Sequence, residues 1–229
     1  KKFDLIIYSP AVNVRHSMSN MLSYPQALGE LTKEHFTIAV SGTHGKSTTT
    51  AMLGLLLVKA GLDPTVIVGT KVKEFGDTNC RMGKSKYLVI EADEHFSSFL
   101  NYWPKIIVLT NIEADHLDYY KNIKNVRRAF QKFISHLPKD GVLIAHRNVR
   151  SSASNKLRQI LKVPGEHNVQ NALLALRVAR VLKIPDKVSF QTLSEYRGAW
   201  RRFEERELKI GNWKLKIVSD YGHHPTQIK

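Results

Sequence analysis

Hydrophobic and polar positions alternate in blocks along the first two thirds of the chain. Short runs rich in Ile and Val are typical of buried strands: FDLIIYS, FTIAVSG, PTVIVGT, KYLVIEA, KIIVLTN and GVLIAH. Between several of them lie stretches with helical spacing, such as STTTAMLGLLLVKAGL and KNVRRAFQKFISHL. Strands that alternate with helices predict an α/β fold, with a mostly parallel sheet flanked by helices.

The pattern weakens in two places. Residues 147–162 show no clear period, and the chain stops at Lys229, soon after the strand-like run WKLKIVS. We expect sequence to be missing at both places. Between them, GEHNVQNALLALRVARVL predicts a strong helix with Ala, Leu and Val on one face, and we expect Asn168 to be its N-cap.

The composition of the chain excludes some classes of protein. The 229 residues are 42% hydrophobic, which allows a sizeable core, and no apolar run approaches the length of a membrane span. A single cysteine, Cys80, excludes an internal disulfide and fits a reducing cytoplasm. The net charge of +15 favours a nucleic-acid surface as an alternative, but the basic residues are scattered and form no recognised nucleic-acid module. We therefore expect small-molecule partners, and neither nucleic acid nor a membrane.

A glycine-flanked lysine lies between a predicted strand and a predicted helix. The loop residues are Gly42, Thr43, His44, Gly45, Lys46, Ser47 and Thr48. Backbone N–H groups of such a loop bind an anion together with the positive end of the helix. Lys46 can reach terminal phosphates, and the Ser47 hydroxyl can bind Mg²⁺. The usual first glycine of the motif is replaced by Val40, so a glycine-rich turn with a surface lysine is the alternative.

Acidic segments follow two further predicted strands. KYLVIEADEH ends in Glu91, Asp93 and Glu94, and IIVLTNIEADHLDYY contains Asn111, Glu113, Asp115, His116 and Asp118. Ligands of α/β sheets gather at the carboxyl ends of strands, where carboxylates can hold Mg²⁺. Glu91 comes first after its strand and is the best candidate ligand, whereas Asp93 and Glu94 can equally be helix caps. His116 can bind a metal, act as a base or hydrogen-bond a turn.

The order of several segments resembles that of the Mur ligases. These segments are GTHGKSTTT, EADE, TNIEADHLDYY, GEHNVQNAL, WRRFE and DYGHHPT. The resemblance implies a domain that binds a uridine nucleotide, a central ATP-binding domain and a C-terminal domain that receives the amino acid. Residues 1–35 are then expected to be a remnant of the first domain and its linker. Residues 36–193 would be the central P-loop-type domain, and residues 194–229 the start of the third.

The resemblance also implies an activity. It is the ATP-dependent ligation of L-alanine to UDP-N-acetylmuramate through an acyl phosphate, in cytoplasmic peptidoglycan biosynthesis, by a monomer or homodimer. ATP, UDP-N-acetylmuramate and L-alanine are the implied small-molecule partners, with Mg²⁺ as cofactor. Two alternatives stay open: ligation of a recycled murein tripeptide, and a non-catalytic module that binds nucleotides or nucleic acid.

Roles for single residues follow from the same resemblance. Lys46, Glu91 and His116 are the implied catalytic residues, with Ser47 and Glu91 as ligands of one Mg²⁺ and His116 as a ligand of a second. Asn168 and Asn171, on one helical face, match a pair of asparagines near the adenine. Arg202 and Asp220 match residues that contact phosphate and ribose when the C-terminal domain closes. The adjacent His223 and His224 are expected in a loop near the nucleotide, the alternative being a metal site.

The chain departs from the family pattern in three places. Ser219 stands where an aspartate is usual, and Ser47 stands where threonine, which has the same hydroxyl chemistry, is common. His95 and Phe96 stand where many relatives have small or acidic residues. We expect Lys46, Ser47, Glu91 and His116 to meet nevertheless at one edge of the sheet, around a magnesium-bound triphosphate.

Overall fold

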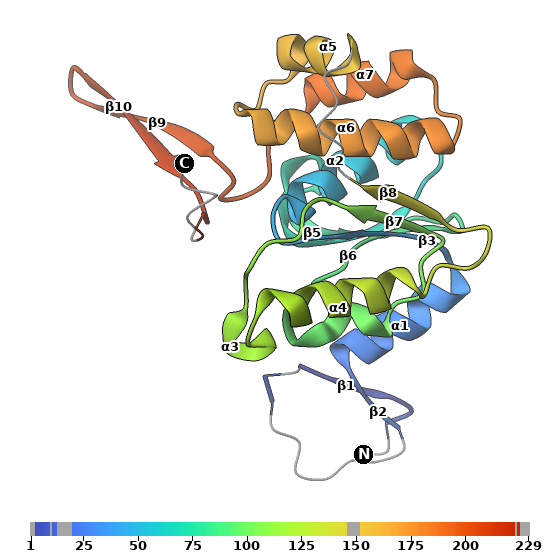
Figure 1. The fold of residues 1–229 in the computed structure, drawn as a ribbon. Helices are drawn as coiled ribbons and strands as arrows, with labels where there is room; N and C mark the ends of the chain where they lie inside the picture. The colour runs from blue at the N-terminus through green and yellow to red at the C-terminus, as the bar shows by residue number, and fades with distance from the viewer. Residues whose placement is uncertain (1–2, 10, 13–19, 146–151, 223, 225–229) are drawn as a thin grey trace.

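Helices cover both faces of a mostly parallel sheet, as the alternation of strands and helices predicts (Figure 1). The computed structural model describes residues 3–9, 11–12, 20–145, 152–222 and 224. The main sheet has six strands in the order β5-β4-β6-β3-β7-β8. In that order the strands are Thr78–Arg81, Thr65–Val72, Tyr87–Glu91, Phe36–Ser41, Ile106–Leu109 and Val142–Ala145. All neighbours are parallel except β4 and β5, which are antiparallel.

The register of the three central strands brings their carboxyl ends to one edge of the sheet. Val40 in β3 pairs with Glu91 in β6 and with Val108 in β7. These strands consist mainly of Ile, Val, Leu and Ala because both of their faces are buried under helices. The loops that follow the strands therefore leave the sheet side by side.

Alternate residues of β3 divide the core in two. Ile38 and Val40 belong to one hydrophobic cluster, and Ala39 belongs to the other. The first face is covered by α2 (Lys46–Lys59) and α6 (Glu166–Val181), and α5 (Ser152–Ile160) and α7 (Asp186–Glu195) pack on these helices as an outer layer (Figure 1). The other face is covered by α1 (Tyr24–Glu34), η2 (His95–Asn101) and α4 (Ile123–Ile134) (Figure 1).

Helix α2 is anchored through an unusually apolar sequence. Every residue from Ser47 to Leu57 is buried, because the helix lies between the sheet and α6. Burying each Leu side chain of this helix contributes about 1.5–3 kcal/mol. The start of α2 is therefore held firmly at the edge of the sheet where β3 ends.

Two strand pairs lie outside the main sheet. β1 (Ile6–Tyr8) pairs in parallel with β2 (Met21–Ser23), so the strand predicted in FDLIIYS is confirmed but belongs to a separate sheet. β9 (Glu204–Ile210) and β10 (Trp213–Ser219) form a hairpin that projects away from the helical layers (Figure 1). The remaining short elements are η1 (Lys73–Phe75) and α3 (Leu117–Tyr120). Within the described ranges, no helix has both the length and the apolar character to cross a membrane.

One helix in the second half of the chain was not predicted, and one expectation was wrong. The stretch 147–162 contains a helix, α5, which packs through the fully buried Leu157; residues 146–151 lie outside the described residues. Asn168 is not the N-cap of α6, because Gly165 occupies that position with φ 96°. Asn168 lies within the first turn, where its N–H donates to the Gly165 carbonyl oxygen at 3.0 Å.

Candidate active site

The loop between β3 and α2 has the geometry of an anion-binding loop. Gly42 has φ 135° and Gly45 has φ 82°, both in the region that favours glycine. A Cβ on Gly45 would also collide with the side-chain oxygen of Asn171 in α6. Gly45 is the N-cap of α2 and provides no side-chain cap, so the first-turn N–H groups at Lys46, Ser47 and Thr48 have no intrahelical partner. Such a helix N-terminus binds phosphate.

Asn111 fixes this loop to the segment that follows β7. Its side-chain oxygen accepts a hydrogen bond from His44 N at 2.9 Å, and its amide nitrogen donates to His44 O at 3.2 Å. Its carbonyl oxygen accepts from Thr43 N at 3.1 Å. Glu113 N donates to Thr43 Oγ1 at 2.9 Å. Sequence reasoning gave Asn111 no role, although it is a polar residue just after a buried strand.

Lys46 is held by two carboxylates. Its Nζ lies 2.7 Å from Glu94 Oε2 and 3.5 Å from Asp93 Oδ1. Burial alone would lower the pKa of Lys46, but the charges of Glu94 and Asp93 outweigh it and raise the pKa. Burial also raises the pKa of Glu94 to about 7, against the opposing effect of Lys46. Glu94 does occupy the N-cap position of η2, yet its side chain makes no cap and contacts Lys46 instead.

Glu91 and Ser47 offer two oxygens to a cation. Ser47 Oγ lies 3.0 Å from Glu91 Oε1, and Gly69 N donates to Glu91 Oε2 at 2.7 Å. Burial raises the pKa of Glu91, and the Gly69 N–H and Lys46 oppose that shift. Adjacent oxygens around an octahedral Mg²⁺ at about 2.1 Å are about 3 Å apart. The donor set and its spacing therefore fit Mg²⁺.

His116 lies close to Glu94, the carboxylate that pairs with Lys46. Its Nε2 is 4.0 Å from Glu94 Oε1, a buried oxygen that accepts no hydrogen bond from the described residues. Its ring stacks on His95 at 4.2 Å, and His95 stacks in turn on Phe96 at 4.1 Å. Burial lowers the pKa of His116, with Asp115 opposing, so the neutral imidazole that can bind a metal is favoured.

The four residues expected to meet do so at the carboxyl edge of the sheet. Lys46 and Ser47 begin α2, Glu91 ends β6, and His116 follows β7. Glu94 connects Lys46 to His116, and Ser47 contacts Glu91 directly. The structure thus confirms their proximity, and the roles given to them stay predictions.

The remaining predicted residues lie on α6 and in the C-terminal segment. Asn168 and Asn171 are both buried on α6, and Asn171 is the one that touches the loop, at Gly45. Arg202 and Asp220 make their described contacts within the C-terminal segment: the Arg202 guanidinium lies 5.6 Å from the Tyr221 ring centre, and Asp220 Oδ2 accepts from Phe203 N at 2.7 Å. The structure therefore does not bring these two to the phosphate loop.

His224 does lie beside the phosphate loop, with its ring 4.7 Å from that of His44. The other histidine of the pair, His223, lies outside the described residues.

Known proteins of similar sequence include UDP-N-acetylmuramate–L-alanine ligases. UDP-N-acetylmuramate–L-alanine ligase from Clostridium acetobutylicum is 35% identical, with 99% of this chain and 59% of the relative covered. The ligase of the same description from Clostridium tetani is 36% identical, with 100% and 60% covered. The chain thus spans about three fifths of the length of these relatives. The match to the first runs over 276 positions against 229 residues here, so that relative has internal residues that this chain lacks.

Solved structures agree with this comparison. The UDP-N-acetylmuramate-alanine ligase MurC from Thermotoga maritima has a TM-score of 0.77 and 27% identity, over 98% of this chain and 62% of that one. A murein peptide ligase from Psychrobacter arcticus has a TM-score of 0.67 and 26% identity, over 91% and 56%. The sequence model of the Mur ligase middle domain matches residues 40–162, more than half of the 229 residues. The chain belongs to the Mur ligase family.

Proposed function

We propose that the whole protein is an ATP-dependent ligase that joins L-alanine to UDP-N-acetylmuramate in peptidoglycan biosynthesis. The observation that carries the proposal is the convergence of Lys46, Ser47, Glu91 and His116 at the start of α2. The matched L-alanine ligases support the choice of substrate, at 35% and 36% identity. The single cysteine fits the reducing cytoplasm, where we place the reaction.

The chain's own strand pairing supports the proposed domain division. Residues 36–193 contain the six-stranded sheet and most of the helices that cover it, and we propose them as the ATP-binding domain. The β1–β2 and β9–β10 pairs each form a separate two-stranded sheet. We propose residues 1–35 as the end of a nucleotide-sugar domain with its linker, and residues 194–229 as the beginning of the domain that receives the amino acid.

Amide formation requires activation of a carboxylate, which is a poor electrophile. A carboxylate oxygen of UDP-N-acetylmuramate takes the terminal phosphoryl group of ATP, which gives an acyl phosphate and releases ADP. The amine of L-alanine then attacks the carbonyl carbon, the amine nitrogen loses a proton, and inorganic phosphate leaves. The start of α2 binds the phosphates through its N–H groups, and the charged Lys46 neutralises the transferring group. Asp93 and Glu94 keep Lys46 charged.

Two places near Lys46 suit divalent cations. Ser47 Oγ and Glu91 Oε1 would hold one Mg²⁺. A second would be held by His116 Nε2 with Glu94 Oε1, which accepts no hydrogen bond within the described part of the chain. When bound, Mg²⁺ supplies positive charge that stabilises the transferring phosphoryl group. We further propose that Asn168 and Asn171 lie near the adenine, and that Arg202 and Asp220 approach the nucleotide when the C-terminal domain closes.

The second candidate function is ligation of a murein tripeptide to the same sugar nucleotide. The likeness to the Psychrobacter arcticus murein peptide ligase favours it, although its TM-score of 0.67 is below the 0.77 of the alanine ligase structure. The complete protein should therefore be offered UDP-N-acetylmuramate with L-alanine or with the tripeptide, and phosphate release measured. Faster release with L-alanine supports the proposal, and faster release with the tripeptide contradicts it. ATP binding without release for either acceptor would support a non-catalytic module.

A further inference from the structure

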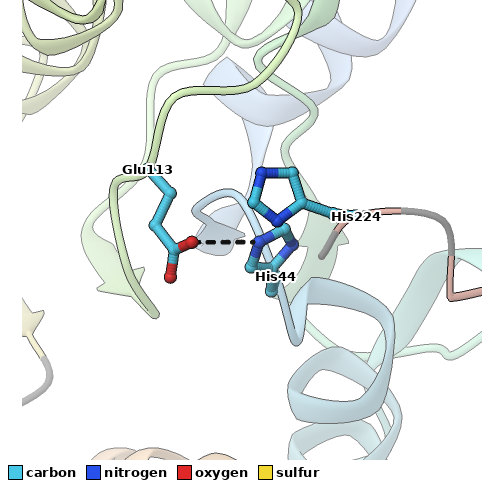
Figure 2. Close-up of side chains that lie close together, drawn as sticks. All are labelled: His44, Glu113 and His224. Carbon is cyan, nitrogen blue, oxygen red and sulfur yellow. Dashed lines mark ion pairs between the residues drawn. The ribbon is translucent and has the colours of Figure 1, made fainter. Parts of the chain in front are cut away.

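Three side chains from distant parts of the sequence meet beside the phosphate loop. Figure 2 shows His44 from that loop, Glu113 from the segment after β7, and His224 from the C-terminal segment. One ligand atom from each lies within 4.8 Å of the other two, and all three residues are partly buried. His44 Nε2 is 3.5 Å from Glu113 Oε2, and the rings of His44 and His224 are 4.7 Å apart.

We propose that His44, Glu113 and His224 bind one zinc-class divalent cation, which fastens the C-terminal segment to the phosphate loop. Two imidazoles and one carboxylate are a ligand set that Zn²⁺ takes, with a fourth position left for water. Mg²⁺ prefers oxygen ligands and octahedral geometry. This site therefore differs in metal preference from the pair formed by Ser47 and Glu91, which offers oxygens alone.

The spacing of the ligand atoms suits such an ion. Ligand atoms bound at about 2 Å in a tetrahedron are about 3.4 Å apart. The separation of 3.5 Å between His44 and Glu113 already meets this requirement. The limit of 4.8 Å for the whole set leaves His224 within reach by rotation of side chains.

Hydrogen bonds from backbone N–H groups to side chains hold the segments of the first two ligands together. Glu113 N donates to Thr43 Oγ1 at 2.9 Å, next to His44 in the chain. Asn111 joins the same two segments through His44 N. A pair of ligands fixed in this way loses little conformational entropy when a metal binds, which raises affinity.

The third ligand comes from a segment that is itself tied in place. Tyr221 N donates to the Arg201 carbonyl oxygen at 2.9 Å, and Asp220 accepts from Phe203 N. His224 follows this anchored turn closely. A cation at the three side chains would add a link from the turn to the phosphate loop, across more than a hundred residues of sequence.

The charge of Glu113 also suits a cation. Its carboxylate Oε2 lies 3.5 Å from His44 Nε2 and supplies negative charge that offsets the charge of the ion.

Zinc titration of the full chain tests the proposal, with a chromogenic chelator as competitor and Co²⁺ absorption as a report of ligand geometry. We expect one equivalent of Zn²⁺ to bind and tetrahedral Co²⁺ bands to appear. His224→Ala and Glu113→Gln should each weaken zinc affinity roughly tenfold or more. Circular dichroism would show that both variants stay folded.

Two histidine variants serve as matched controls. His136 bonds to the Tyr102 carbonyl oxygen and stacks on Trp103, so His136→Ala should leave zinc affinity unchanged. His35 lies at the end of α1 with its Nδ1 3.0 Å from the Leu31 carbonyl oxygen, so His35→Ala should also leave zinc affinity unchanged. Undetectable zinc binding by the parent would overturn the site. So would a zinc affinity of the His224 and Glu113 variants equal to that of the parent, or a loss of zinc affinity in either control. Zinc binding retained in Lys46→Ala would show that the site is independent of ligase activity.

Discussion

The ammonium nitrogen of Lys46 lies 2.7 Å from Oε2 of Glu94, a carboxylate whose side chain is only 2% exposed. Such a pair is sensitive to the loss of either partner, because the remaining charge is then buried without compensation. In this chain the pair also places the lysine at the start of α2, where the phosphates are expected. The pKa of Glu94 therefore depends directly on whether the charge of Lys46 is in place.

The first prediction concerns the titration of Glu94. Its pKa should lie near 7 in the parent chain, because burial outweighs the effect of Lys46. Lys46→Met removes a charge that lowers this pKa, so the pKa should rise further. Carboxyl ¹³C NMR can follow the titration, with Glu94→Gln assigning the resonance. A midpoint near 4.5 in the parent, or an unchanged midpoint in Lys46→Met, would show that the pair is not formed as described.

The second prediction concerns stability against pH. The pKa of Glu94 is higher in the folded chain than its ordinary 4.5, so the folded state binds a proton that the unfolded state has released. Its contribution to stability is complete below about pH 4.5 and is lost as the pH rises through about 7.

Glu94→Gln stays neutral and should lack this loss. Urea unfolding of both proteins at about pH 5 and about pH 8 measures the difference, since the other carboxylates are common to them. Parallel losses of unfolding free energy in the two proteins would contradict the assignment.

The third prediction separates backbone strain from collision in the phosphate loop. Gly45 and Gly61 have similar φ values of 82° and 75°, but only Gly45 has a neighbour, Asn171, where a Cβ would lie. Gly61→Ala should cost about 1–2 kcal/mol of unfolding free energy from strain alone. Gly45→Ala should cost more, and Asn171→Ala should relieve the excess in the double variant. Urea unfolding measures the four variants and the parent, and equal costs for the two glycine substitutions would show that the Asn171 contact is absent.

Much of the fold follows from local sequence, and the errors have local causes. Strands β3, β6 and β7 are predictable because apolar residues that are buried on both faces form continuous runs. β5 was missed because its sequence, TNCR, is polar and lies at the exposed edge of the sheet. α5 was missed because only three of its nine residues are buried and two of these are Ala and Ser, so few large apolar side chains mark its buried face.

The site was predictable only in part. Glycine, lysine and serine at a strand–helix junction predict a phosphate-binding loop, because the geometry of such a loop is local in sequence. The hydrogen bonds of Asn111 to the loop join residues that are 67 apart in sequence, and no local pattern encodes such a contact. Propensity favoured Asn168 over a glycine as helix cap, but Gly165 at φ 96° gives the chain a turn that residues with a Cβ rarely adopt.

The fourth prediction tests the proposed magnesium ligand Glu91. Glu91→Gln keeps the size of the side chain but removes the charge, so the Mg²⁺ concentration needed for half-maximal phosphate release should rise roughly tenfold or more in the complete protein. Glu30→Gln, on the exposed surface of α1, is the matched control and should leave this concentration unchanged. A magnesium dependence that is the same in the parent and in Glu91→Gln would remove Glu91 from the site.

Phosphate release by the complete protein with Lys46 replaced tests the central claim most directly. With ATP, Mg²⁺, UDP-N-acetylmuramate and L-alanine, Lys46→Ala should release phosphate about 100-fold more slowly or worse, because a preorganised charge at the transferring group is lost. Lys59→Ala, at the exposed end of the same helix, should keep the parent rate. A parent-like rate in Lys46→Ala would contradict a phosphoryl-transfer site at the start of α2.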